Sequence, residues 1–270
     1  MRILLLKPYA GRTKELELCQ RVARPDTQIE FRNLEGEFPI SHVHHRYFRY
    51  QAIDRVLEHV MRAEQEGFDG VCIACGADPG LYEARELVDI PVTSTFESGG
   101  HIAATMGQKF SVITTVFYAV PNMEELARLY GFDHKLASVR SLRIPGRNLY
   151  AGRTSPEQIV ERINEVAQQC FEEDGAEVVL LTATLAATIY AEAGLPPVTT
   201  NGMPIVDSMI AGFKMCETMV DLHKLGGIPP ISRVSAFRSP HEPEYRAMRA
   251  SQGRPLYRGL SDQPDDDTAN

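Results

Sequence analysis

The sequence predicts an α/β fold of two similar lobes, each a mainly parallel sheet flanked by helices, with an active-site cleft between them. Short apolar runs alternate with longer amphipathic segments along most of the chain, which is typical of a helix-covered parallel sheet. The order of elements also repeats: residues 71–94 and 179–200 each contain an apolar strand, a polar loop, a helix and a Pro-Val-Thr strand. The chain has 270 residues and 43% hydrophobic content, enough for a large buried core.

In the first half of the chain, predicted strands alternate with predicted helices. Apolar runs bounded by Gly, Pro or polar residues predict strands over 2–7, 27–34, 70–74 and 90–93. Helical spacing of apolar residues predicts helices over 13–22, 46–66, 81–88 and 98–106. Thr13 is a candidate N-cap, and Gly67 is expected to end the second helix. Residues 35–45 are predicted to be irregular, because they contain Gly36, Pro39 and three histidines.

The second half repeats the alternation with one long connection. Strands are predicted over 110–114, 135–144, 176–181 and 197–199, and helices over 120–130, 156–173, 184–192 and 204–224. Residues 145–155 form the connecting loop, in which Ser155 followed by Pro156 gives a strong helix-start signal.

The predicted elements group into two lobes and a tail. We assign residues 1–95 and 205–225 to the first lobe, 96–204 to the second lobe, and 226–270 to a C-terminal extension. The extension is rich in Pro, Gly, Arg and Ser and closes with Asp265, Asp266 and Asp267. Such a polar composition buries little apolar surface, so its last residues are expected to be a solvated tail.

Charge and cysteine content limit the partners. The formal net charge is −8 and the pI is about 5.5, with no long basic stripe, so nucleic acid is not expected to bind. No segment has the roughly 20 apolar residues that span a bilayer. The first apolar run stops at Lys7, too early for a secretion signal. Five scattered cysteines then indicate reduced thiols in a cytoplasm rather than a disulfide framework.

Cys75 is the candidate catalytic residue. It lies where the apolar strand 71–74 ends and the polar loop Gly76 to Gly80 begins. Ligands bind at the carboxyl ends of the strands in open α/β sheets, and glycines allow the backbone to approach a ligand closely. The competing interpretation is a packing cysteine, because free cysteines are usually buried and inert.

Several motifs spread over most of the chain resemble one family. They are Cys75-Gly-Ala-Asp-Pro-Gly-Leu81, Arg85-Glu-Leu-Val-Asp-Ile-Pro-Val92, Phe110-Ser-Val-Ile-Thr-Thr115, Leu129-Tyr-Gly-Phe132, Ala137-Ser-Val-Arg140, Glu173-Asp-Gly-Ala-Glu-Val178 and Pro204-Ile-Val-Asp207. Together they resemble the aspartate/glutamate/hydantoin racemase superfamily, most closely its hydantoin and allantoin racemase branch. The resemblance implies a cofactor-free enzyme in which one thiol from each lobe reaches the substrate α-carbon. One thiolate removes a proton and the other thiol returns one to the opposite face, as inversion requires.

The sequence departs from this family pattern at two places. The second-lobe cysteine implied by the resemblance falls on Ala183, and Cys170 and Cys216 lie inside predicted helices. Neither neighbouring hydroxyl, Thr182 or Thr184, replaces a thiol, because a hydroxyl pKa is far too high. The family's Asn-Pro-Asn-Thr-like loop is replaced by Lys7-Pro-Tyr-Ala10, whose lysine either binds a substrate carboxylate or points into solvent.

The remaining substrate-binding candidates follow the ends of the predicted strands or lie in the histidine-containing loop. They are Lys7, Tyr9, Gly76, Ala77, Thr114, Thr115, Phe117, Thr182, Ala183, Thr184 and His45. We expect no metal. Cys72 and Cys75 have zinc-like spacing but no second pair, and the cluster His42, His44 and His45, with Glu37 or Glu97, is more often a solvated loop or a substrate contact. Glu97 and His101 are expected to form a surface pair or to lie outside direct contact with substrate.

The expected function is therefore a cytoplasmic, cofactor-independent racemase-like enzyme with a small-molecule substrate. The exposed tail and the resemblance to the family together predict a homo-oligomer. Cys75 would move a proton next to a carbonyl of a small polar substrate such as a hydantoin, an amino acid derivative or a dicarboxylate. The first alternative is a single-cysteine decarboxylase or lyase acting on a related acid, since decarboxylating members of the superfamily work with one cysteine, although theirs lies in the other lobe. The second is a catalytically inactive small-molecule binding protein that kept the pocket.

Overall fold

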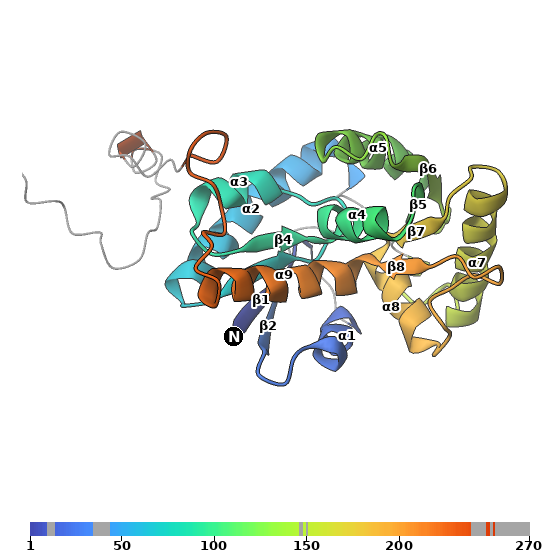
Figure 1. Ribbon diagram of the computed structural model, residues 1–270, viewed down its shortest axis with the longest axis horizontal. Helices are drawn as coiled ribbons and strands as arrows, with labels where there is room; N and C mark the ends of the chain where they lie inside the picture. The colour runs from blue at the N-terminus through green and yellow to red at the C-terminus, as the bar shows by residue number, and fades with distance from the viewer. Residues whose placement is uncertain are drawn as a thin grey trace, which may run out of the picture.

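The computed structural model describes residues 1–9, 14–34, 44–145, 148–149, 151–238, 247–248 and 251. Two four-stranded sheets form two lobes, with strand orders β2-β1-β3-β4 and β6-β5-β7-β8 (Figure 1). Every strand pair within each sheet is parallel, and helices flank both sheets. The predicted α/β fold of two similar lobes is confirmed.

The first lobe is built around two central strands that are buried except at Arg2. Its strands are β1 (Arg2–Lys7), β2 (Gln28–Asn33), β3 (Gly70–Ile73) and β4 (Val92–Ser94), and its helices include α1 (Lys14–Val22), α2 (Arg46–Gln65) and α3 (Leu81–Leu87). Leu4 and Leu6 of β1 pack with Val71 and Ile73 of β3 against α2. The continuous apolar runs of β1 and β3 suit strands covered by helices on both faces.

The second lobe repeats this arrangement. Its strands are β5 (Phe110–Thr114), β6 (Leu136–Ser141), β7 (Val178–Leu181) and β8 (Ile205–Asp207). Its helical segments include η2 (Phe117–Ala119), α5 (Val120–Leu129), α7 (Pro156–Glu172) and α8 (Thr184–Glu192). The predicted start of α7 is confirmed, because Ser155 and Gln158 form a reciprocal capping box there.

Two helices cross between the lobes. Helix α4 (Thr95–Met106) follows β4 of the first sheet but packs Phe96 and Ala103 on the second, and α9 (Ser208–Lys224) follows β8 but packs Met209 and Phe213 on the first. A Cβ on Gly212 of α9 would lie 3.1 Å from the Thr95 Cα. This exchange of helices fixes the two lobes relative to each other.

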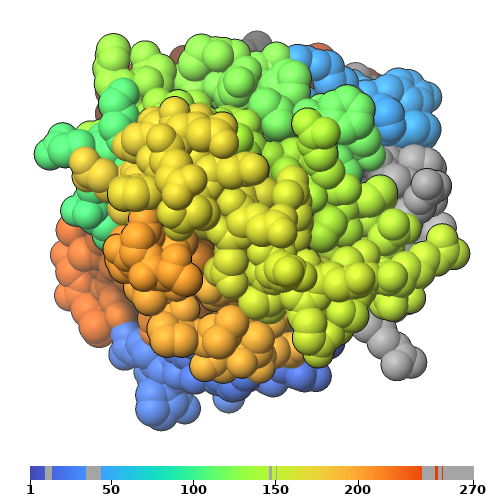
Figure 2. Space-filling model, turned by 90° about the vertical axis from the view of Figure 1, so that its right-hand side faces the viewer, coloured from blue at the N-terminus to red at the C-terminus, as the bar shows by residue number. Residues whose placement is uncertain are grey.

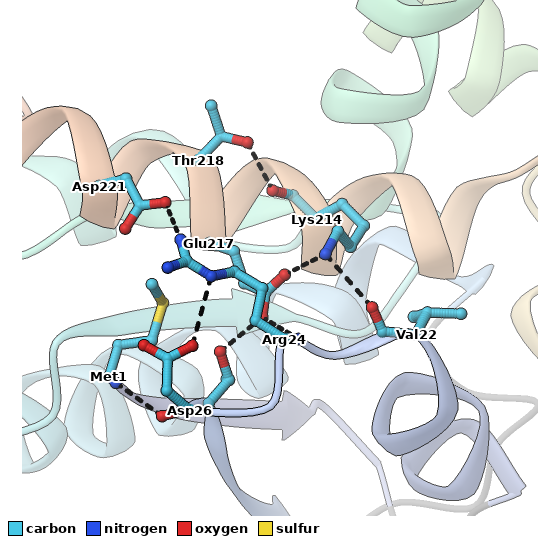
Figure 3. A network of polar contacts seen from close by, with 9 residues as sticks. Met1, Val22, Arg24, Asp26, Lys214, Glu217, Thr218 and Asp221 are labelled. Atoms are coloured by element: carbon cyan, nitrogen blue, oxygen red, sulfur yellow. Dashed lines mark hydrogen bonds and ion pairs between the residues drawn. The ribbon is translucent and has the colours of Figure 1, made fainter.

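A polar network ties α9 to the first lobe (Figure 3). Arg24, which follows α1, forms an ion pair with Asp221, and its backbone N–H donates to Glu217 at 3.0 Å. Lys214 donates to the Val22 carbonyl at 3.2 Å and pairs with Glu217. These contacts anchor the C-terminal end of α1 and thereby the helix that reaches the second lobe.

The largest error of the sequence analysis concerns the fourth strand of the second sheet. The predicted strand 197–199 does not form; Val198 makes only an isolated antiparallel bridge with Pro204. Residues 192–198 are exposed, whereas Ile205 and Val206 are buried and pair with β7, so burial selects 205–207 as the strand. Residues 205–207, which we had assigned to the first lobe and to the start of the last helix, therefore belong to the second sheet.

Smaller shifts affect other element ends. Helix α4 begins at Thr95 rather than at 98, β4 covers 92–94 rather than 90–93, and β6 stops at 141 rather than 144. Several expectations lie outside the described residues: the Thr13 cap, Glu37, His42, and much of the extension 226–270. Across the described part of the chain, we find no helix with the length and apolar character needed to cross a membrane.

Candidate active site

A pocket lies between the lobes, where the carboxyl ends of the central strands meet. It holds about 550 Å³ of space free of protein atoms, including its opening to solvent. Its wall contains Tyr9 after β1, the loop after β3, Thr114 and Thr115 at the end of β5, and the segment after β7. The full set of described lining residues is Tyr9, His44, Cys75, Gly76, Ala77, Thr114, Thr115, Met123, Leu149, Thr182, Ala183, Thr184 and Leu185.

Cys75 is held in this wall by a tight loop. It lies two residues beyond β3, its side chain is 4% exposed, and its carbonyl accepts the Asp78 N–H at 3.0 Å. Asp78 has a left-handed φ of 42°, and its carboxylate accepts the Ser94 hydroxyl at 2.6 Å and the Phe96 N–H at 2.9 Å. The carboxylate of the loop thus caps α4 and fixes the position of the thiol.

Burial dominates the acid–base properties of this thiol. It raises the pKa of Cys75 to about 12, and the nearby Asp78 carboxylate acts in the same direction. The Ala77 backbone N–H, Lys7 and Arg49 act in the opposite direction, because they stabilise the thiolate. The thiol is therefore protonated at neutral pH, and once ionised it is a strong base.

Ala183 is the positional counterpart of Cys75. Ile73 ends β3 and pairs with Leu6 of β1, while Leu181 ends β7 and pairs with Ile113 of β5. Each strand is the third in the same strand order, and two residues further along lie Cys75 and Ala183. One lobe therefore presents a thiol to the pocket, whereas the other presents a methyl group at the matching position.

The two loops approach each other closely. A Cβ on Gly76 would lie 2.3 Å from the Thr182 carbonyl oxygen, a distance that no side chain tolerates. Glycine at this position is required by the contact between the lobes rather than by its backbone angles. The pocket is therefore narrow at the point where the two loops meet.

The two hydroxyl groups that follow β7 in the pocket wall donate into the protein. Thr182 Oγ1 donates to the Ile113 carbonyl at 3.1 Å, and Thr184 Oγ1 donates to Glu15 Oε1 at 3.5 Å. The same Glu15 oxygen accepts Lys7 Nζ at 2.7 Å, and both of these charged side chains are fully buried. Glu15 lies on α1, which reaches the second lobe beside α8; the N-terminal segment, in blue, follows the lower edge of that lobe in Figure 2.

Most of the predicted substrate-binding residues line the pocket, but three do not. Lys7 is buried behind the wall, with its Nζ 5.0 Å from the centroid of the Tyr9 ring. Phe117 is 68% exposed. The exposed His45 stacks on Tyr118, with ring centroids 5.8 Å apart.

His44, rather than His45, lines the pocket. Burial lowers the pKa of His44 to about 4, and the neighbouring His45 acts in the same direction. Its imidazole is therefore neutral at pH 7. Among the described residues, no group of three or more His, Cys, Asp or Glu is placed to hold a metal ion. Glu97, considered earlier for such a role, instead forms a bidentate pair with Arg85.

The sequence analysis missed Glu15 and the apolar wall residues Met123, Leu149 and Leu185. A signal for Glu15 was present: it precedes Leu18 and Cys19 by three and four residues, so it lies on the buried face of its helix. A carboxylate at a core position of an amphipathic helix requires a buried partner that compensates its charge. The partner, Lys7, comes from the preceding strand, and a sequence pattern does not show this contact.

Comparisons with known proteins agree on one family. The family model described as "Asp/Glu/Hydantoin racemase" matches residues 14–216. A hydantoin racemase from Pseudomonas sp. (strain NS671) is 30% identical over 261 residues, which cover 94% of this chain and 98% of the relative. The crystal structure of an allantoin racemase from Pseudomonas fluorescens is 27% identical with a TM-score of 0.74, covering 90% of this chain and 98% of that one. An allantoin racemase from Klebsiella pneumoniae, 24% identical, shares the fold with a TM-score of 0.75 over 90% of this chain and 94% of that one.

Proposed function

This chain belongs to the Asp/Glu/hydantoin racemase family, and we propose that it is a cofactor-independent enzyme in which Cys75 transfers a proton at the carbon next to a carbonyl. The observation that carries the proposal is the position of Cys75: a buried thiol in the pocket wall, at the carboxyl end of a central strand. The thiolate removes the α-proton, and the electron pair moves onto the carbonyl oxygen to give an enolate. The thiol then returns a proton to the same carbon, restoring the carbonyl and the thiolate.

The second lobe supplies stabilisation for the enolate. Helix α8 begins at Thr184 in the pocket wall, and its N-cap residue Ala183 makes no side-chain cap. The first N–H groups of a helix have no partner within the helix, and its N-terminus carries partial positive charge. A carbonyl oxygen placed against this first turn is stabilised as negative charge develops on it.

The pocket is best suited to a neutral substrate. None of the described residues that line it is a lysine or an arginine, and His44 is neutral at pH 7. A dicarboxylate would bring two negative charges into this wall without a cation to pair with them, at a large desolvation cost. Small cyclic amides or ureides fit better, and the names of the hydantoin and allantoin racemase relatives support that class.

Cys75 is the single thiol among the described lining residues, so we propose chemistry from one face of the substrate. This predicts exchange of the α-proton with retained configuration. The test uses enantiopure 5-methylhydantoin in heavy water, with NMR to follow deuterium at C5 and chiral chromatography to follow optical purity. Exchange well above the uncatalysed background, with slower loss of optical purity, is the expected result.

Two outcomes would overturn parts of this proposal. Racemisation as fast as exchange would require a second acid and would contradict the one-face mechanism. Saturable binding of hydantoins without any exchange would identify a binding protein instead of an enzyme. Iodoacetamide provides a check that does not depend on turnover: it should inactivate the enzyme over time, and 5-methylhydantoin should protect it.

A further inference from the structure

A buried ion pair lies behind the second-lobe wall of the pocket, and neither of its residues lines the pocket. Lys7 Nζ and Glu15 Oε1 are 2.7 Å apart, and their side chains are 0% and 1% exposed. Glu15 Oε2 is also buried, and no described group forms a hydrogen bond with it. A buried charge is costly unless it is paired and hydrogen-bonded. The pair therefore requires explanation beyond packing.

The carboxylate determines the direction of one hydrogen bond in the wall. An ionised carboxylate only accepts hydrogen bonds. The Thr184 hydroxyl, 3.5 Å from Glu15 Oε1, must therefore be the donor. Its single hydrogen points away from the pocket toward α1, and the oxygen keeps lone pairs for a second partner. Thr184 itself lines the pocket.

The hydroxyl group of Thr182 also donates its hydrogen into the protein, but to a different acceptor. Thr182 Oγ1 donates to the Ile113 carbonyl at 3.1 Å, and a carbonyl is also an acceptor only. The hydroxyl groups of Thr182 and Thr184 thus both donate their hydrogens into the protein, which leaves each oxygen only as an acceptor for a further partner. In contrast, the first turn of α8 beside them offers backbone donors. The wall therefore presents an acceptor next to a donor.

We infer that Glu15, held by Lys7, is a positioning residue that fixes the Thr184 hydroxyl as a hydrogen-bond acceptor for a substrate N–H adjacent to the reactive carbon. Thr184 thereby becomes a specificity-determining residue. This inference rests on the proposed function and sharpens it: the substrate carries an N–H beside the reactive carbon and a carbonyl on the other side, as a cyclic ureide does. An ester, a ketone or an N-alkylated amide has no hydrogen for Thr184 to accept.

The experiment compares two ligands that differ by one methyl group. 5-Methylhydantoin carries N1–H beside C5, whereas 1,5-dimethylhydantoin has a methyl group on that nitrogen. Dissociation constants are measured by titration calorimetry, and KM and kcat by deuterium exchange at C5. A hydrogen bond to a neutral acceptor corresponds to a preference of roughly threefold to tenfold for the N1–H ligand. The methyl group adds a steric penalty, so the preference is judged between variants.

Variants at two positions isolate the hydroxyl and its orientation. T184V should lose the threefold to tenfold part of the preference, mainly through KM, and T184S should keep it. E15Q should keep it as well, because Lys7 only donates hydrogen bonds and therefore holds the amide oxygen at the place of Oε1, where it still accepts from Thr184. E15M removes the acceptor and should lose the preference, and the double variant E15M/T184V should show no further loss relative to T184V. E17Q, an exposed glutamate on the same helix, is the matched control and should behave as wild type.

The outcomes separate this inference from the proposed function. If T184V retains the wild-type preference, or if the E15M effect persists undiminished in the T184V background, Glu15 does not act through Thr184. Binding of neither ligand to the wild type would also overturn the inference. Exchange that depends on Cys75 but is found only with substrates lacking an N–H would sink the inference and leave the thiol chemistry standing. Because T184V removes no charge, its result stands even if E15M folds poorly.

Discussion

The loops after β3 and β7 occupy equivalent places in two sheets of identical strand order, yet they present different chemistry to the pocket. The first carries Cys75, fixed by the capping carboxylate of Asp78. The second carries Ala183, followed by Thr184, whose hydroxyl is directed at a glutamate from the other lobe. A duplicated scaffold thus supplies two matching positions at one cleft, and the side chains at those positions decide whether the reaction uses both faces of the substrate.

The contrast extends to the ends of the central strands. Lys7 ends β1 and Thr114 ends β5 at equivalent registers, because Leu6 and Ile113 pair with the matching residues Ile73 and Leu181. Lys7 places a positive charge within electrostatic range of Cys75, whereas Thr114 is uncharged. The two lobes therefore differ at the base of the pocket as well as in its walls. The charge of Lys7 favours the thiolate form of Cys75, and the second lobe has no matching charge at Thr114.

The largest effect is expected from removing the thiol. C75A should lower kcat/KM for α-proton exchange by roughly 10²–10⁴-fold, the usual contribution of a positioned acid–base group. The measurement is the initial rate of deuterium incorporation at C5 of 5-methylhydantoin. Circular dichroism and thermal unfolding show whether the fold is retained.

C72A provides the matched control for C75A. Cys72 is three residues earlier, on β3, and packs with Ile3, Leu5 and Phe213 away from the pocket. Its loss should lower the free energy of unfolding but leave the exchange rate close to that of wild type. If C72A and C75A reduce exchange equally, the loss would not be specific to the thiol in the pocket wall. Cys75 would then have no special role in the exchange.

Restoring symmetry is expected to have the next largest effect. A183C adds a thiol to the pocket wall at the counterpart of Cys75. The ratio of racemisation to exchange should rise by about tenfold or more, because the second face then has an acid of workable pKa. Chiral chromatography of the recovered hydantoin gives the ratio. A ratio that does not change would mean that position 183 does not face the reactive carbon.

The narrow contact between the loops can be tested separately from the thiols. G76A places a methyl group 2.3 Å from the Thr182 carbonyl oxygen, so the loops must move apart. Overpacking of this kind costs about 1–3 kcal/mol of unfolding free energy. Urea denaturation measures the cost, and the exchange rate should fall in parallel. Wild-type stability in G76A would mean that the two lobes are not fixed against each other at this contact.

The fold was largely predictable from sequence, and so was the location of Cys75 in the wall of a pocket between the lobes. Periodicity and Gly and Pro punctuation located the strands next to the pocket, β1, β3, β5 and β7, to within two residues at each end. The fourth strand of the second sheet was misplaced because Pro-Val-Thr at 197–199 resembles the true strand 92–94 more closely than Ile-Val-Asp at 205–207 does. Short apolar runs of this kind differ in burial, which is decided by tertiary packing.

The wall of the pocket was predictable only where it follows the ends of strands. Thr114, Thr182 and Thr184 were found in this way and line it. Lys7 was also at a strand end, but its side chain is buried against Glu15 instead of facing the cleft. No sequence rule pairs a strand residue with a helix residue eight positions later. The orientation of Thr184, which depends on that pair, was out of reach for the same reason.

The smallest expected effect concerns how Lys7 tunes the thiol. Because burial raises the pKa of Cys75 to about 12, thiolate is the minor form below that pH, and alkylation by iodoacetamide should accelerate about tenfold per pH unit between pH 7 and 10 without a plateau. Lys7 stabilises the thiolate, so K7M should slow alkylation at every pH by a factor on the order of a few. E15Q removes the charge that offsets Lys7 and should accelerate alkylation, whereas E17Q should change nothing. A plateau near pH 8 would show that burial does not dominate the pKa of Cys75, and unchanged alkylation in K7M would show that the asymmetry between Lys7 and Thr114 has no electrostatic consequence for this thiol.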